Sequence, residues 1–149
     1  MKIINTKNEK QTKKLGENFA RKIVKAGLQK NAVVVALNGN LGSGKTTFLQ
    51  GFAYGLKIKE KILSPTFVIQ KKFKIIGEFE NFYHMDCYRI ENPSEILDMD
   101  FKKIILNPKN IIAIEWPEKI KKYLPRHTIF IDFEFIDETK RNVIINYGE

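Results

Sequence analysis

The stretch at residues 39–47 constrains this chain more than any other part of its sequence. It reads Gly-Asn-Leu-Gly-Ser-Gly-Lys-Thr-Thr and matches the pattern G-x-x-x-x-G-K-[ST]. A loop that wraps a polyphosphate must aim several backbone N–H groups inward, and glycine permits the dihedral angles that this requires. Lys45 supplies a positive charge for the β- and γ-phosphates, and the Thr46 hydroxyl can hold Mg²⁺. These residues predict a phosphate-binding loop, called the P-loop below.

The segments on both sides of the P-loop support this interpretation. An apolar, β-branched run at residues 32–37 predicts a buried strand that leads into the loop, and apolar residues at helical spacing through residue 56 predict a helix after it. Gly51 and Gly55 in this helix indicate close packing against a neighbour. The following residues are therefore expected to bind a nucleotide: Gly39, Asn40, Leu41, Gly42, Ser43, Gly44, Lys45, Thr46 and Thr47.

Length and composition indicate one domain over residues 1–149, with a cytoplasmic location. The single cysteine, Cys87, excludes an internal disulfide and fits a reducing compartment. No signal peptide or membrane-spanning run is recognisable, so no membrane partner is expected. The formal net charge is +9, but nearly all of the positive charge comes from scattered lysines. This pattern favours a general composition bias, with nonspecific attraction to nucleic acid, over a dedicated binding patch.

The rest of the sequence predicts a series of helices and strands. Thr6 and Glu9 fit a capping box for a helix that runs to about residue 29. Asn92 and Pro93 predict the start of another helix. A short helix is expected at residues 118–123, and strands are expected at residues 67–73, 81–86, 111–114, 128–136 and 141–147, the first two of them as a hairpin.

Two acidic residues are candidates for the chemistry that a P-loop requires. Glu115 directly follows an apolar strand, and in a parallel sheet such strand ends gather at the phosphate crevice, so we favour a metal ligand over an ordinary strand-end acid. Strand alternation puts Asp86 on one face with His84 and Tyr88. This trio suggests either water positioning with outer-sphere metal contact, or a polar strand end with a hydrogen-bonded core histidine.

Two further residues have open interpretations at this point. Thr66, in the segment Ser-Pro-Thr at residues 64–66, is either a switch that senses the γ-phosphate or part of a simple proline turn. Arg89 is either a phosphate clamp or, as its residue type alone favours, a member of a surface ion pair.

Taken together, the motifs resemble those of a known family over nearly the whole chain. They are the P-loop, Ser-Pro-Thr-Phe at residues 64–67, His-x-Asp-x-Tyr-Arg at residues 84–89 and Glu-Trp-Pro-Glu at residues 115–118. In order and spacing they resemble the small ATPase of the bacterial tRNA threonylcarbamoyladenosine machinery, the TsaE family. The resemblance implies an α/β P-loop NTPase fold, with a mainly parallel central sheet extended by antiparallel strands and helices on both faces.

The same resemblance implies roles for individual residues. Lys45 is the phosphate lysine, and Thr46 and Glu115 are the Mg²⁺ ligands. Asp86 is needed for hydrolysis, and Thr66 is part of a switch. Two more positions correspond to residues at the base end of the nucleotide, namely Arg141 near the adenine and Thr12 near the N-terminus.

The function implied is that of an accessory subunit that binds ATP and Mg²⁺ and hydrolyses ATP. Its partner is a two-protein complex that transfers threonylcarbamoyl to the adenosine beside the tRNA anticodon, so that tRNA is met only through that complex. A small-molecule kinase is the alternative, although the chain has only four arginines and lacks the Arg-rich lid of such enzymes. A nucleotide-gated RNA-binding module is a third possibility, but no stacked-aromatic RNA motif is present.

Overall fold

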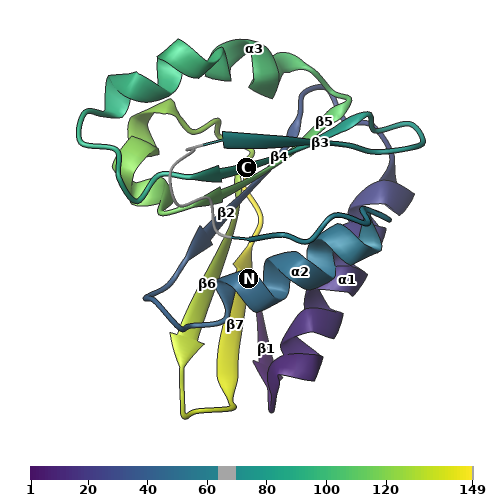
Figure 1. Cartoon of the computed structure of the whole chain (residues 1–149), viewed down its shortest axis with the longest axis vertical. Helices are drawn as coiled ribbons and strands as arrows, with labels where there is room; N and C mark the ends of the chain where they lie inside the picture. The colour runs from purple at the N-terminus through teal and green to yellow at the C-terminus, as the bar shows by residue number, and fades with distance from the viewer. Residues whose placement is uncertain (64–69, 149) are drawn as a thin grey trace.

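A seven-stranded sheet forms the centre of the molecule, in the order β1-β7-β6-β2-β5-β4-β3 (Figure 1). The computed structural model describes residues 1–63 and 70–148. The strands are β1 (Lys2–Thr6), β2 (Val33–Asn38), β3 (Gln70–Lys74), β4 (Asn81–Asp86), β5 (Asn110–Glu115), β6 (Ile129–Phe135) and β7 (Arg141–Asn146).

The middle of the sheet is parallel and both of its ends are antiparallel. Strand β2 pairs in parallel with β5 and with β6, and β4 pairs in parallel with β5. Antiparallel pairs add β3 beside β4 at one end, and β7 and then β1 beside β6 at the other. The predicted mainly parallel centre with antiparallel extensions is confirmed.

Helices cover both faces of the sheet, as expected. On one face lie α1 (Glu9–Ala26) and α2 (Lys45–Gly55), and on the other lie the 3₁₀ helix η1 (Pro93–Met99), α3 (Phe101–Leu106) and the 3₁₀ helix η2 (Pro117–Tyr123) (Figure 1). Successive residues of β2 belong to opposite cores: Val35 packs with Phe48 and Phe52, whereas Val34 packs with Ile96 and Phe101. Since side chains alternate along a strand, a strand buried on both faces must be apolar at every position.

Helices α1 and α2 lie in backbone contact. A Cβ atom added at Gly51 would overlap the carbonyl group of Lys13, and one added at Gly16 would overlap that of Phe48. The expectation that Gly51 and Gly55 allow close packing is confirmed, because a Cβ atom at Gly55 would also overlap a backbone carbonyl, that of Glu17.

The expected start of the first helix is wrong. Thr6 ends strand β1, which the sequence analysis did not predict, and Asn8 is the N-cap, because its side chain accepts a hydrogen bond from the N–H of Gln11. The helix also ends earlier than expected, at Ala26. Gly27 has φ of 81°, and its N–H bonds to the carbonyl of Val24, which terminates the helix.

Most other predicted elements are present. The β3–β4 hairpin is confirmed, and β4 has the expected bounds, whereas the first part of the strand expected at residues 67–73 lies outside the described residues. Asn92 forms a capping box with Glu95, but the helix that follows is 3₁₀ rather than α. Within the part of the chain that the structure describes, no helix combines the length and the apolarity needed to cross a membrane.

Candidate functional site

The P-loop connects the end of β2 to the start of α2. Three of its glycines have positive φ, namely Gly39 at 152°, Gly42 at 77° and Gly44 at 106°. A residue with a side chain would be strained at each of these positions, which explains the glycine spacing. Gly44 is the N-cap of α2, and its carbonyl accepts the helical bond from the N–H of Phe48 at 2.9 Å. The positive end of the α2 dipole therefore faces the loop.

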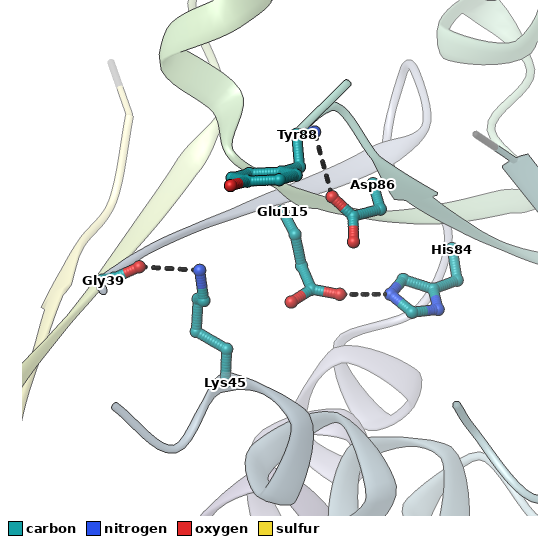
Figure 2. A network of polar contacts seen from close by, with 6 residues as sticks. All are labelled: Gly39, Lys45, His84, Asp86, Tyr88 and Glu115. Carbon is teal, nitrogen blue, oxygen red and sulfur yellow. Dashed lines mark hydrogen bonds and ion pairs between the residues drawn. The ribbon is translucent and has the colours of Figure 1, made fainter. Parts of the chain in front are cut away.

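Lys45 is held in place at the first position of α2. Its side chain is buried, and Nζ donates to the carbonyl oxygen of Gly39 at 2.6 Å (Figure 2). The ammonium group also lies 4.2 Å from the ring centroid of Trp116. Burial lowers the pKa of Lys45, while the carboxylates of Glu115 and Asp86 act in the opposite direction. These contacts hold the Lys45 ammonium group at the phosphate-binding loop.

The two candidate acids lie on neighbouring strands. Because β4 and β5 are parallel and paired in register, Asp86 and Glu115 are direct partners at the carboxyl ends of these strands. Glu115 is only 3% exposed and accepts a hydrogen bond from Nε2 of His84 at 2.7 Å. Figure 2 shows the Glu115 carboxylate between Lys45 and His84. The buried histidine therefore has a hydrogen-bond partner and orients this carboxylate.

Asp86 has a different environment from Glu115. It is half-buried, and its Oδ1 accepts the N–H of Tyr88 at 3.0 Å (Figure 2). Burial raises the pKa of the Asp86 carboxyl, and the hydrogen bond from Tyr88 opposes this rise. The two acids thus offer one nearly enclosed carboxylate and one that is open to the cleft.

The cleft around these groups has a volume of about 270 Å³. Its lining residues come from the P-loop and from elements far apart in the sequence, and they are Glu9, Thr12, Leu41, Gly42, Ser43, Gly44, Lys45, Thr46, Thr47, Asp86, Tyr88, Glu115, Trp116, Thr139 and Arg141. Two predicted loop residues, Gly39 and Asn40, are not in this lining, although Gly39 binds Lys45. Thr66 lies outside the described residues.

Sequence reasoning named several of these lining residues as members of the nucleotide site only in part or not at all. Trp116 and Tyr88 form an aromatic wall with ring centroids 5.1 Å apart. Their positions directly after Glu115 and near Asp86 were the available signal. Glu9 and Thr139 also line the cleft, and nothing in the sequence marked them as cleft residues.

The two residues expected at the base end of the nucleotide both reach the cleft. Thr12 is buried, and its hydroxyl lies 2.7 Å from that of Thr6 and donates to the carbonyl of Asn8. Its hydroxyl is therefore engaged within the protein. Arg141 lies beside Gly44 and donates to main-chain carbonyls of the P-loop. Arg89, by contrast, is exposed and is not part of the cleft lining.

The residues present fit a magnesium ion held jointly with phosphate. Among residues 1–63 and 70–148, no cluster of three or more His, Cys, Asp or Glu residues could hold a metal ion by itself. A nucleotide-bound Mg²⁺ needs few protein ligands, because phosphate oxygens and waters supply the rest. Thr46 and Glu115 both line the cleft and offer a hydroxyl and a carboxylate oxygen, which are ligands that Mg²⁺ prefers.

Known proteins resemble this chain over nearly its whole length. The family model described as "Threonylcarbamoyl adenosine biosynthesis protein TsaE" matches residues 6–143. Several proteins named "tRNA threonylcarbamoyladenosine biosynthesis protein TsaE" are similar to this chain in sequence. The one from Rickettsia felis is 37% identical, covering all of this chain and 82% of the relative. The one from Bacillus subtilis is 33% identical, and the match covers 93% of this chain and 80% of the relative.

A solved structure agrees with these sequence matches. The crystal structure of Bacillus subtilis YdiB superposes with a TM-score of 0.71 at 29% identity, over 99% of this chain and 86% of YdiB. The sequence matches and the structural match point to the same family. The P-loop, the acids at the ends of β4 and β5 and the sheet order are consistent with it. The chain belongs to the TsaE family of threonylcarbamoyl adenosine biosynthesis proteins.

Proposed function

We propose that this protein binds ATP with Mg²⁺ and hydrolyses ATP as an accessory subunit in the threonylcarbamoylation of the tRNA adenosine next to the anticodon. One observation carries the proposal: a single cleft holds the P-loop lysine together with two carboxylates from neighbouring parallel strands. The names of the relatives support the tRNA pathway. Residues 1–149 act as one P-loop ATPase domain, supported by the single sheet on which both cores are built.

The binding half of the site is formed by the start of α2 and the end of β5. Lys45 moves from the Gly39 carbonyl to the β- and γ-phosphates, while backbone N–H groups of the loop contact the remaining phosphate oxygens. Thr46 and Glu115 would hold Mg²⁺, and His84 orients the Glu115 carboxylate. When bound, the metal neutralises charge on the β- and γ-oxygens.

The hydrolytic half depends on Asp86. One of its oxygens accepts the N–H of Tyr88, and Asp86 lines the cleft, so we assign the catalytic contact to the other oxygen. That oxygen accepts a hydrogen bond from the attacking water and orients it toward the γ-phosphorus. The products are ADP and inorganic phosphate. Thr66, which lies outside the described residues, is proposed as a γ-phosphate switch on the strength of the family resemblance.

The transfer of threonylcarbamoyl is assigned to the two-protein partner complex, which also brings the tRNA. The scarcity of positive groups at the γ-phosphate supports an accessory role. In the described residues, Arg141 is the one arginine that lines the cleft, and its guanidinium is bound to main-chain carbonyls. A partner that supplies charge or orders the switch would complete the site.

The direct test is ATP binding by Lys45→Ala, with Lys102→Ala as a control. Lys102 is an exposed residue of α3 on the opposite face of the sheet. Loss of a charge-assisted contact in the cleft should weaken Mg²⁺–ATP binding by ~2–3 kcal/mol, whereas Lys102→Ala should leave it unchanged. Calorimetry measures the affinity, and emission from Trp116, 4.2 Å from the Lys45 ammonium, provides a second signal.

Two outcomes would count against the proposal. A folded Lys45→Ala variant with wild-type ATP affinity would contradict the P-loop assignment. Turnover that depends on a small acceptor molecule, with no phosphate release in its absence, would favour the small-molecule kinase instead.

A further inference from the structure

The guanidinium of Arg141 links two loops through main-chain carbonyls. Its Nε donates to the carbonyl of Ser43 and its Nη2 to that of Gly42, both at 2.9 Å. Its Nη1 donates to the carbonyls of Asp137 at 2.6 Å and Lys140 at 2.9 Å. Four of the five guanidinium N–H groups can be satisfied in this way, half of them by the P-loop.

The other end of this link is a hydrogen-bonded turn between β6 and β7. Oδ1 of Asp137 accepts the N–H groups of Thr139 at 2.9 Å and Lys140 at 2.8 Å. These hydrogen bonds lower the pKa of the Asp137 carboxyl. The Arg141 guanidinium also lies 4.8 Å from the ring centroid of Phe135 on the same hairpin. The hairpin itself therefore positions the arginine.

The P-loop is a segment that benefits from such a restraint. Gly42 and Gly44 have positive φ, and glycine has the greatest backbone freedom to lose when a loop is ordered. The carbonyl of Ser43 and the N–H of Gly44 belong to one planar peptide unit, so that a bond to the carbonyl also orients the N–H. The N–H of Ser43 bonds to the carbonyl of Asn40 at 3.1 Å. Arg141 thus fixes the peptide units at the entrance to α2.

We propose that Arg141 is a positioning residue that holds the P-loop in its phosphate-binding conformation through the Gly42 and Ser43 carbonyls. This inference rests on the proposed nucleotide-binding function and differs from a contact with adenine. Its consequence is that Arg141 contributes equally to the affinity of every ligand that carries a polyphosphate, whatever base is attached. Preorganising a loop improves affinity by lowering the cost of ordering it on binding.

The test compares three ligands in the presence of Mg²⁺: ATP, GTP and inorganic tripolyphosphate. Arg141→Lys keeps the positive charge but loses the planar fork that reaches both loops. Arg126→Lys is the matched control, since Arg126 is exposed and does not line the cleft. We expect Arg141→Lys to lower the affinity for all three ligands by the same factor, on the order of tenfold. Arg126→Lys should leave all three affinities unchanged.

A second variant and a second measurement keep the inference testable if Arg141→Lys folds poorly. Asp137→Ala removes the exposed side chain that accepts hydrogen bonds within the β6–β7 turn. It should lower the affinity for all three ligands by one common factor, smaller than that of Arg141→Lys. In the ligand-free protein, both variants should speed amide hydrogen exchange at residues 39–44 while β2 stays protected. A direct contact with the base would not change exchange in the absence of ligand.

Several results would overturn the inference. Weaker ATP binding with unchanged tripolyphosphate binding would assign Arg141 to the base or the ribose. Unchanged affinity for all three ligands, or unchanged exchange at residues 39–44, would show that the link does not organise the loop. If the unmodified protein bound neither ATP nor tripolyphosphate, the proposed function itself would fail, which is a distinct result.

Discussion

Asp86 and Glu115 show how two carboxylates that are register partners can have different environments. They are register partners on β4 and β5, yet Glu115 is nearly fully buried and bonded to His84, whereas Asp86 is half-buried and held by a backbone N–H. A fixed, enclosed carboxylate suits a metal ligand. A carboxylate with one oxygen open to the cleft suits the orientation of water.

Alanine substitutions should separate these two roles. Glu115→Ala is expected to weaken Mg²⁺-dependent nucleotide binding, because a metal ligand is lost. Asp86→Ala is expected to leave ATP binding intact and to abolish phosphate release, because the water is no longer oriented. Calorimetry with and without Mg²⁺ and a phosphate-release assay measure the two effects. If Asp86→Ala abolished binding and Glu115→Ala did not, the roles would be reversed.

His84 should affect Mg²⁺ affinity through its hydrogen bond to Glu115. In His84→Ala the buried Glu115 carboxylate loses its hydrogen-bond donor at 2.7 Å, so that Mg²⁺ affinity should fall by ~10–100-fold. Stability should also fall, by ~1–3 kcal/mol, because a buried polar group is left unpaired. A Mg²⁺ titration of nucleotide binding and a denaturant titration measure the two quantities.

His127→Ala provides a matched control for this variant. Nε2 of His127 lies 3.0 Å from the carbonyl of Ala32, and His127 lies outside the lining of the nucleotide cleft. We expect this variant to affect stability alone. Wild-type Mg²⁺ affinity in a folded His84→Ala protein would show that the histidine has only a packing role.

At the scale of elements, the pairing of α1 with α2 positions the P-loop helix. Gly16 on α1 and Gly51 on α2 let the two backbones touch, and the aromatic residues Phe19, Phe48 and Phe52 fill the space beside this contact. The same contact brings the start of α1, with Glu9 and Thr12, to the edge of the cleft. Helix packing therefore contributes to the shape of the site.

Gly51→Ala should be strongly destabilising, although alanine is the better helix former. The added methyl group would overlap the Lys13 carbonyl, which belongs to the backbone and cannot rotate away. We expect a loss of ~1–3 kcal/mol in the free energy of unfolding, measured by denaturant titration. Gln50→Ala on the same helix should change it by less than ~0.5 kcal/mol. An unchanged transition midpoint in Gly51→Ala would mean that the helices are not in contact there.

At the scale of the whole molecule, the cleft depends on both halves of the sheet. The P-loop follows β2, the two acids end β4 and β5, and Arg141 opens β7 at the antiparallel side (Figure 1). Among the described arginines, Arg141 is the one that lines the cleft, and its guanidinium donates to main-chain carbonyls. An arginine at the transition state is worth ~10³–10⁵ in rate in related phosphoryl transfers.

We therefore expect slow ATP hydrolysis by the isolated protein and clear stimulation by the two-protein transferase complex. Steady-state phosphate release with and without that complex measures the effect. The Lys45→Ala variant with the complex present is the control for contaminating ATPase activity. Equal rates with and without the complex would mean that the chain is a self-sufficient ATPase.

The sequence by itself determined the local features whose physics is short-range. The P-loop, the apolar β2 strand before it and the α2 helix after it were all predictable, because glycine spacing and hydrophobic periodicity are properties of neighbouring residues. The bounds of β4 were also predictable. Strand β1 was missed because it is a short edge strand with mostly exposed side chains, which lacks an apolar signature.

Tertiary structure alone decided which distant residues meet. The parallel register of β4 and β5 brings Asp86 beside Glu115, and no local pattern encodes that register. The bond from Arg141 to the Ser43 carbonyl joins positions 98 residues apart, and a main-chain carbonyl carries no sequence signal. Long-range contacts follow from the packing of the whole sheet and its helices, so they appear only once the chain has folded.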